Sequence, residues 1–203
     1  MRPYGFTDVA AMLIVVRHGR TEANANGLLV GRRIDPGLDE VGRRQAQALR
    51  TVLSGAARVI SSPLLRARET ADALGLPMQV DERWIEIDYG TFDGMPLADL
   101  PAATWVEWRA DTQFALEGGE SLAAVGERVR SAAEELVEEC RDRDVVVVTH
   151  VSPIKAVTAW ALGVDDETIW RMYCAPGSIT EIGTAGATPT LRAYNSTAHL
   201  SGL

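Results

Sequence analysis

The sequence contains few of the residues that mark disulfide-rich and zinc-binding proteins. Only two of its 203 residues are cysteine, Cys140 and Cys174, and they lie in no CxxC or cysteine–histidine pattern. Disulfide frameworks and zinc sites need several such residues at regular spacing. The sequence therefore predicts two reduced thiols, a cytoplasmic protein and no zinc site.

Positive charge is also scarce. The chain has 20 Lys and Arg residues against 28 Asp and Glu residues, which gives a formal net charge of -8. Nucleic acids and anionic membranes are bound through clustered Lys and Arg, so neither is expected as the main partner. A small anion is still a candidate ligand, because it needs only local positive charge. The oligomeric state stays open.

Long apolar runs are absent as well. No run approaches a membrane span of roughly 20 residues, and the run over residues 12–16 is too short for a signal-peptide core. Apolar residues make up 46% of the chain and charged residues 24%, as in globular proteins. We expect a flexible lead-in over residues 1–11 and one domain over residues 12–203. Met12 stands directly before the first apolar run, so translation could start at Met1 or at Met12.

Short apolar runs alternate with helical patterns along the chain, which is typical of an α/β fold. Strands are predicted over residues 12–16, 57–60, 76–80, 145–148, 179–182 and 190–193. Helices are predicted over residues 39–54, 64–71 and, as one long amphipathic helix, 120–144. Asp39 is the expected N-cap of the first helix. Ser152 is expected to cap a further helix, with Pro153 in its first position.

Basic side chains follow three of the predicted strands. Arg17 and His18 follow the first, Arg66 lies in the helix after the second, and His150 follows the strand over residues 145–148. Ligands bind at the carboxyl ends of strands in α/β sheets, where helix N-termini also attract anions. Two guanidiniums and two imidazoles suit a dianionic phosphoryl group. A neutral imidazole can attack phosphorus while the guanidiniums stabilise the growing charge.

An alkoxide that leaves phosphorus needs a proton, and the middle of the chain supplies the candidates. Glu86 is the first choice as donor and Glu82 the second. Residues 94–119 are expected to cover the site, with residues 95–116 contacting the leaving group. Trp105 and Trp108 suit either the core or this contact. The arginines of the loop over residues 27–37, Arg32 among them, are expected on the solvated surface.

Taken together, these residues resemble the histidine phosphatase superfamily in its phosphoglycerate-mutase-like branch. The motifs that carry the resemblance are Arg17-His18-Gly19 with Thr21 and Asn24, Ser61-Ser62-Pro63 with Arg66 and Thr70, Glu86 before Asp88-Tyr89-Gly90, Gly119-Glu120-Ser121, and Thr149-His150. They span residues 13 to about 200. The resemblance implies a three-layer α/β/α sandwich with a mostly parallel central sheet. It also implies a phosphohistidine intermediate, with no metal and no other cofactor.

Carried over by position, the resemblance makes His18 the nucleophile. It makes Glu86 the proton donor and later the base that activates water. The side chains that would hold the phosphoryl group are Arg17, Arg66, His150, Asn24 and Thr21. All of these are cationic or able to form hydrogen bonds with phosphate oxygens.

The chain departs from the branch in one stretch of the expected pocket wall. Leu28 and Val30 stand where many mutases and sugar phosphatases have Arg and Gln, so the wall is less polar than one built for phosphoglycerate. Residues 151–155 are similar to the acid phosphatase and alpha-ribazole phosphatase members. We therefore expect a phosphomonoesterase that hydrolyses a small phosphorylated metabolite. A cofactor-dependent phosphoglycerate mutase and a non-catalytic phospho-ligand binding module are the alternatives.

Overall fold

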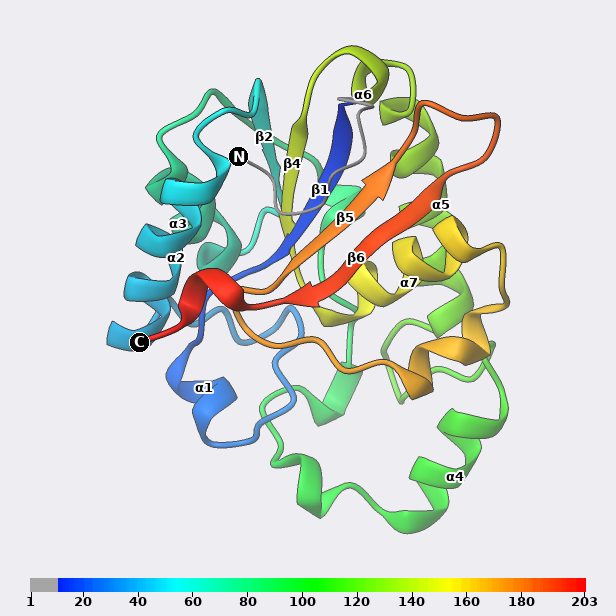
Figure 1. Ribbon diagram of the computed structural model, residues 1–203. Helices are drawn as coiled ribbons and strands as arrows, with labels where there is room; N and C mark the ends of the chain where they lie inside the picture. Colours follow the sequence, from blue (N-terminus) through cyan, green and yellow to red (C-terminus); the bar gives the residue numbers. More distant parts are fainter. Residues whose placement is uncertain (1–10) are drawn as a thin grey trace.

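Six strands form one sheet between two layers of helices in the computed structural model, which describes residues 11–203 (Figure 1). The strands are β1 (Met12–Arg17), β2 (Arg58–Ser61), β3 (Met78–Val80), β4 (Val145–Thr149), β5 (Ile179–Gly183) and β6 (Thr190–Ser196), in the spatial order β3-β2-β4-β1-β5-β6. The first four pair in parallel, whereas β5 is antiparallel to both β1 and β6. The expected three-layer sandwich with a mostly parallel sheet is confirmed. Except for Ala11, the predicted lead-in lies outside the described residues.

The central strands are apolar throughout because both faces of the sheet are covered. Leu13 and Val15 of β1 pack on one side with α5 (Leu122–Leu136) and α7 (Val151–Leu162). Ile14 and Val16 point to the other side, toward α2 (Glu40–Leu53) and α3 (Leu65–Leu74). Figure 1 shows these two helical layers on either side of the sheet. The alternation along β1 follows from the two-residue period of a strand.

The carboxyl ends of the three central strands lie level with one another. Arg17 at the end of β1 is opposite Thr149 at the end of β4, and Ser61 at the end of β2 is opposite Val148. The basic residues that follow these strands therefore start from one edge of the sheet. The short helices α1 (Glu22–Ala25) and α4 (Ala102–Ala110) lie beyond this edge, at the bottom of Figure 1.

The first long helix begins and ends where the sequence predicts. Asp39 is the N-cap of α2, and its carboxylate accepts a hydrogen bond from the Gly42 amide at 2.7 Å. Ser54 is the C-cap. A cap from farther away holds α3, where the Asp35 carboxylate accepts from the Leu65 amide at 2.9 and 3.0 Å. Aspartate at a helix start binds amides that the helix itself leaves free.

The prediction of one long helix over residues 120–144 is wrong. α5 ends at Leu136, and a separate turn, α6 (Glu139–Asp142), follows it. The Val137 amide bonds to the Glu134 carbonyl three residues back, which ends the regular four-residue pattern. The following turn is fixed by tertiary contacts, because Arg58 of β2 binds the Glu139 carboxylate at 2.6 and 2.9 Å. The apolar spacing continues across this break, so the sequence does not reveal it.

The predicted start of the last long helix is also wrong. α7 begins at Val151, with His150 in the N-cap position, so Ser152 is not the cap and Pro153 is not the first residue. The amides of Val151 and Ser152 are bound by the carboxylate of Glu86, each at 3.1 Å. A residue distant in sequence thus takes the place of the local serine cap.

The remaining described turns are 3-10 helices: η1 (Glu82–Trp84), η2 (Gly90–Phe92), η3 (Leu97–Asp99), η4 (Asp166–Arg171) and η5 (Ala198–Leu200). Three of them, η1 to η3, lie in the excursion between β3 and α5. Among residues 11–203 no helix combines the length and the apolar character that crossing a bilayer requires.

Candidate active site

The first part of the site is the end of β1. The His18 amide donates to the Thr149 carbonyl of β4 at 2.9 Å, so the turn after the strand stays attached to the sheet. Arg17 donates from Nη1 to the Cys174 carbonyl at 2.6 Å. Its Nε is buried and has no hydrogen-bond partner among the described residues. Arg17 is thus anchored by one nitrogen and keeps another for a ligand.

The ring of His18 is held in one tautomer. Its Nδ1 lies 2.7 Å from the Gly19 carbonyl oxygen, which can only accept, so Nδ1 carries the proton and Nε2 keeps its lone pair. The side chain is 2% exposed. Burial, followed by the charges of Arg66 and Arg17, holds the pKa of His18 well below its usual value. The imidazole is therefore neutral and nucleophilic near pH 7.

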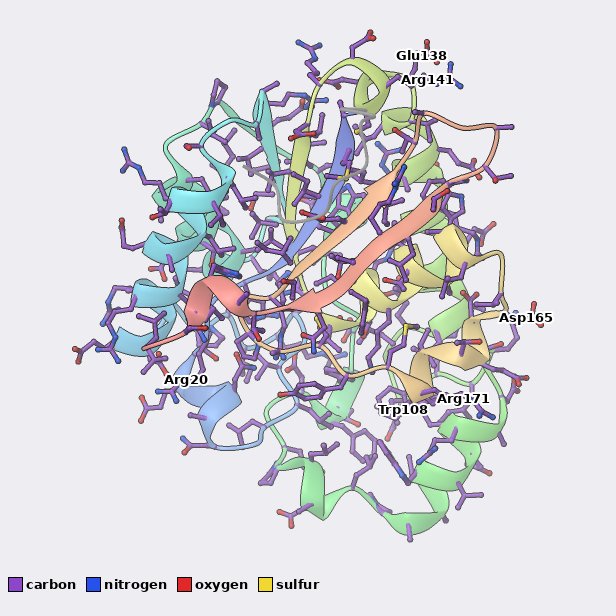
Figure 2. The ribbon with its side chains drawn as sticks, viewed as in Figure 1. Arg20, Trp108, Glu138, Arg141, Asp165 and Arg171 are labelled. Atoms are coloured by element: carbon purple, nitrogen blue, oxygen red, sulfur yellow. The ribbon has the colours of Figure 1, made fainter. Side chains whose placement is uncertain are left out.

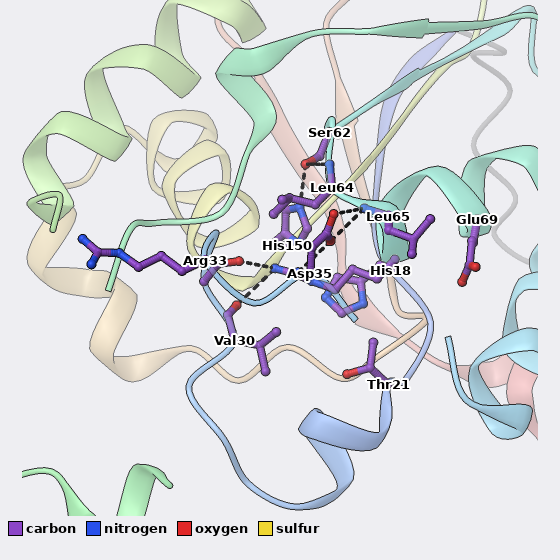
Figure 3. A network of polar contacts seen from close by, with 12 residues as sticks. His18, Thr21, Val30, Arg33, Asp35, Ser62, Leu64, Leu65, Glu69 and His150 are labelled. Carbon is purple, nitrogen blue, oxygen red and sulfur yellow. Dashed lines mark hydrogen bonds and ion pairs between the residues drawn. The ribbon is translucent and has the colours of Figure 1, made fainter. Parts of the chain in front are cut away.

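His150 comes from the end of β4 and lies beside His18, with ring centroids 5.0 Å apart. Its Nε2 is 2.7 Å from the Ser62 hydroxyl, a contact that Figure 3 shows next to His18. Its Nδ1 is buried without a hydrogen-bond partner in the described part of the chain. Burial, with smaller effects of Arg66 and His18, lowers the pKa of His150. With Ser62 donating to Nε2, the ring proton of His150 is on Nδ1, which is then a buried donor for a ligand.

Arg66 comes from the first turn of α3 and is fully buried. Its Nη2 donates to the carbonyls of Val30 and Gly31 at 3.1 and 2.8 Å, and its Nη1 lies 3.6 Å from the Asp35 carboxylate. Nε and Nη1 have no hydrogen-bond partner among residues 11–203. Nη2 of the guanidinium is therefore bound to the main chain, whereas Nε and Nη1 can donate hydrogen bonds to a ligand.

These cationic and imidazole groups form one cluster. Arg17 and Arg66 both lower the pKa values of His18 and His150, so all four lie within short electrostatic range. The buried nitrogens without a partner are Arg17 Nε, Arg66 Nε, Arg66 Nη1 and His150 Nδ1. Buried donors are normally paired, and each unpaired one costs about 1–3 kcal/mol. A phosphoryl group offers the negative oxygens that would pair them.

Glu86 joins this edge of the sheet through α7. Its side chain is 3% exposed. Oε1 accepts from the amides of Ile87 at 2.9 Å and Ser152 at 3.1 Å, and Oε2 accepts from the Val151 amide at 3.1 Å. Val151 directly follows His150, so the carboxylate lies at the start of α7, beside the main chain that follows His150. Glu82, the second candidate, is exposed on η1.

Thr21 and Asn24 bind each other in the structure. Together they form the capping box of α1: the Thr21 hydroxyl accepts from the Asn24 amide at 3.1 Å, and Asn24 Oδ1 accepts from the Thr21 amide at 3.2 Å. Thr21 is fully buried, and Figure 3 shows it beside His18. Their predicted contact with a phosphoryl group stays a prediction.

The two tryptophans of α4 belong to an aromatic cluster. Trp108 is 4% exposed and packs edge-on against Trp105, Trp170 and Tyr89, with ring centroids 5.1 to 5.8 Å apart. Figure 2 shows Trp108 between α4 and the segment that carries Arg171. Trp105 is half-buried. The structure thus assigns Trp108 to the core, while Trp105 keeps access to solvent.

The sequence does not reveal the site contacts of two residues, Ser62 and Arg32. Ser62 had no assigned role, although it lies in the Ser61-Ser62-Pro63 motif, which could have drawn attention to it. Arg32 was expected on the solvated surface, and this is wrong: it donates to the Glu86 carbonyl at 2.6 Å and to Glu120 at 2.5 Å. No local pattern around Arg32 indicates these contacts. No group of three or more His, Cys, Asp or Glu side chains suited to a metal ion occurs in the described range.

A family model and several relatives match this chain over most of its length. The model of the histidine phosphatase superfamily (branch 1) matches residues 13–197. Phosphoserine phosphatase 1 of Hydrogenobacter thermophilus is 36% identical over 200 residues, covering 93% of each chain. The chain also shares 36% identity over 208 residues with a bifunctional protein of Mycobacterium tuberculosis, and it spans only 57% of that protein's length.

Solved structures resemble the fold closely. A mycobacterial glucosyl-3-phosphoglycerate phosphatase in complex with VO3 has a TM-score of 0.82 at 31% identity, covering 93% of this chain and 100% of that one. The alpha-ribazole phosphatase of Shigella flexneri has a TM-score of 0.80 at 29% identity, covering 91% of this chain and 96% of that one.

Proposed function

The chain belongs to branch 1 of the histidine phosphatase superfamily. From this premise we propose that it is a phosphomonoesterase that hydrolyses a small phosphorylated metabolite through a phosphohistidine on His18. One observation carries the proposal: a buried neutral imidazole lies among guanidinium and imidazole nitrogens that form no hydrogen bond within the described range. These groups can bind a phosphoryl dianion and stabilise its transfer.

The first step is transfer of the phosphoryl group to His18. The lone pair on Nε2 attacks phosphorus as the bond to the alcohol oxygen breaks. The Gly19 carbonyl holds the Nδ1 proton at 2.7 Å and so stabilises the positive charge that the ring acquires. Arg17, Arg66 and His150 Nδ1–H donate to the oxygens of the group in transfer.

Glu86 is the proposed donor to the departing alkoxide. Oε1 already accepts two amide hydrogen bonds and Oε2 accepts one, so Oε2 is the oxygen with room for the transferable proton. After the alcohol leaves, the same carboxylate takes a proton from water. The hydroxide attacks phosphorus, the nitrogen–phosphorus bond breaks, and inorganic phosphate and neutral His18 are released.

The class of substrate follows from the relatives and from the pocket wall. The named relatives act on phosphoserine, on glucosyl-3-phosphoglycerate and as an alpha-ribazole phosphatase, all phosphorylated small molecules. Val30 is buried, and its carbonyl accepts from Arg66, so its main chain lies beside the proposed phosphoryl site. A screen of phosphorylated metabolites, read as kcat/KM, ranks the candidates. A phosphoglycerate mutase would instead require a bisphosphoglycerate primer.

We also propose that the reaction is independent of metal ions and takes place in the cytoplasm. The guanidiniums of Arg17 and Arg66 supply the positive charge for which other phosphatases use a metal. The two cysteines are free thiols, both buried, which suits a reducing compartment.

The test of the proposed function is the covalent intermediate. We expect turnover of a phosphomonoester, stopped by alkaline denaturation, to leave phosphate on His18, detectable by mass spectrometry of the peptide that carries Arg17 and His18. Alkaline conditions are needed because acid destroys phosphohistidine. His18→Asn should abolish the label. Phosphate on serine, aspartate or His150 would contradict the assignment.

A further inference from the structure

A partly buried ionic network lies behind the proposed proton donor. The Glu120 carboxylate binds two arginines from different segments of the chain. Arg32 donates from Nη2 to Oε2 at 2.5 Å, and Arg128 of α5 donates from Nε to Oε1 at 2.9 Å and from Nη2 to Oε2 at 3.0 Å. The side chains of Arg32, Glu120 and Arg128 are 27%, 17% and 17% exposed. One carboxylate thus holds two mutually repelling cations in place.

Each arginine uses its remaining nitrogens to bind the main chain around Glu86. Arg32 donates from Nε to the carbonyl of Glu86 itself at 2.6 Å. Arg128 donates from Nη1 to the carbonyl of Arg83 at 2.6 Å. The Thr149 hydroxyl binds the carbonyl between them, that of Trp84, at 2.5 Å. The segment that carries the donor is therefore fixed from both sides.

The backbone of Glu120 is fixed to the same region. Its amide donates to the Asp88 carbonyl at 2.9 Å. Gly90 lies so close to the segment that precedes Glu120 that a Cβ on Gly90 would be 2.0 Å from the Glu117 carbonyl oxygen. The φ of Gly90 is +60°, a backbone conformation that favours glycine. Neither segment can shift without the other. The position of the Glu120 carboxylate is thus coupled to the position of Glu86.

We propose that Glu120 is a positioning residue for the proton donor, acting through Arg32 and Arg128 on the main chain of residues 83–86. The inference rests on the proposed role of Glu86. The groups bound to Glu120 are not the unpartnered nitrogens of the phosphoryl site. Glu120 contributes instead to the proton transfer from Glu86 to the departing alcohol.

A displaced donor slows only the reactions that need one. Misplacement of a catalytic group by about 1 Å can cost roughly 10²-fold in rate. Glu120→Gln leaves one acceptor oxygen for two arginines, so the main chain at Glu86 loses part of its support. An alkyl alkoxide needs the proton to leave, whereas nitrophenolate leaves without it. The Glu120→Gln variant should therefore release an alkyl alcohol more slowly while it releases nitrophenol at nearly the normal rate.

The experiment is a single-turnover measurement with enzyme in excess, which follows alcohol release and so isolates the first step. For Glu120→Gln we expect release of an alkyl alcohol to slow by about 10–100-fold and release of nitrophenol to change by less than about threefold. The ratio of the two rates is insensitive to the fraction of folded enzyme. Glu138→Gln is the matched control: Glu138 binds Arg141 at 2.8 Å on the surface, away from residues 83–86, and is 83% exposed. This control should change neither rate.

Parallel variants separate the inference from the function on which it depends. If Glu86→Gln discriminates between the substrates and Glu120→Gln does not, the positioning role is overturned while the donor role stands. If Glu86→Gln fails to discriminate, the donor role itself falls. A change confined to KM would make the network a substrate-binding device and would also overturn the proposal. Should Glu120→Gln not fold, Arg32→Lys, which cannot bind both Glu86 and Glu120, should show the same discrimination.

Discussion

At the scale of single residues, Glu86 binds the start of a helix with the same carboxylate that we propose as the proton donor. Its two oxygens bind the first two amides of α7, the helix that follows His150. A helix N-terminus attracts negative charge, so it stabilises the carboxylate that Glu86 becomes once it has given its proton to the alkoxide. The proton transfer that we propose takes place at a helix cap.

Replacing Glu86 by Gln should therefore affect substrates unequally. General acid catalysis contributes roughly 10²–10⁴-fold, and we expect a loss of that order on alkyl phosphates. On nitrophenyl phosphate the first step should be nearly normal, but hydrolysis of the phosphohistidine should be slow because the base for water is gone. Pre-steady-state kinetics should show a burst of nitrophenol followed by slow turnover. Equal losses on both substrates without a burst would point to another donor, and Glu82 would be tested next.

The two buried histidines also predict how stability depends on pH. Because their pKa values are lowered by burial, the unfolded chain binds more protons than the folded protein once the pH falls below the ordinary histidine value of about 6.5. The free energy of unfolding should thus have its full value above that pH and decline below it, by at most about 1.4 kcal/mol per pH unit for each histidine.

Urea unfolding between pH 7.5 and 5.5, in a buffer without phosphate, measures this effect. The free energy of unfolding should fall across the range, and His18→Asn should make the decline shallower. A free energy that is constant between these pH values would show that the buried imidazoles are not neutral in the folded protein.

At the scale of elements, α4 is held to the body of the protein by aromatic side chains. Trp108 packs against Tyr89 and against Trp170 of η4, while Arg109 lies over the rings of Trp105 and Trp170 at 5.9 and 5.8 Å. α4 has no side-chain cap at its N-terminus. Its position therefore depends on this cluster more than on its own hydrogen bonds.

The two tryptophans of α4 should respond differently to substitution. Trp108→Ala should lower the free energy of unfolding by about 3–5 kcal/mol, because it leaves a cavity in the core. Trp105→Ala, at a half-buried position, should cost less stability and should change kcat/KM ratios between substrates. Denaturant unfolding and kinetics on several phosphate esters measure the two effects. Equal kinetic losses of Trp105→Ala for every substrate would remove α4 from substrate selection.

At the scale of the whole molecule, a chain with a net charge of -8 keeps its buried cations at one edge of the sheet. Arg17 and Arg66 end up there because β1 and β2 run parallel and end at the same level. The topology thus concentrates positive charge within an acidic protein. This arrangement suits a small dianion and does not require a basic surface.

Because these arginines supply the charge, chelation should leave the activity unchanged. We expect the same kcat and KM before and after dialysis against a strong chelator. Arg66→Lys provides the complementary measurement: lysine lacks the forked geometry, so affinity for substrate should fall markedly with or without added metal. Restoration of activity by a divalent ion after chelation would contradict metal independence.

Much of the fold could be read from local patterns. Apolar runs gave the strands, Asp39 and the helical spacing after it gave α2, and the order of basic residues after strands gave the cluster of Arg17, His18 and His150. The failures occurred where a distant residue replaces a local signal. Ser152 looks like a cap, but the carboxylate of Glu86 holds the start of α7. Glu139 continues a helical pattern, but its ion pair with Arg58 belongs to a separate turn.

The sequence by itself determined which chemistry is available: two imidazoles, two guanidiniums and a carboxylate, each placed directly after a strand or beside one. The sequence ranked Glu86 before Glu82, and the tertiary structure adds a physical difference between these two carboxylates four positions apart: Glu86 is buried and bound to α7, whereas Glu82 is exposed. Only the tertiary structure placed Arg32 behind Glu86. The physical reason is the range of the interactions: strand and helix patterns arise within a few residues, whereas hydrogen bonds and ion pairs between segments form only when the chain brings them together.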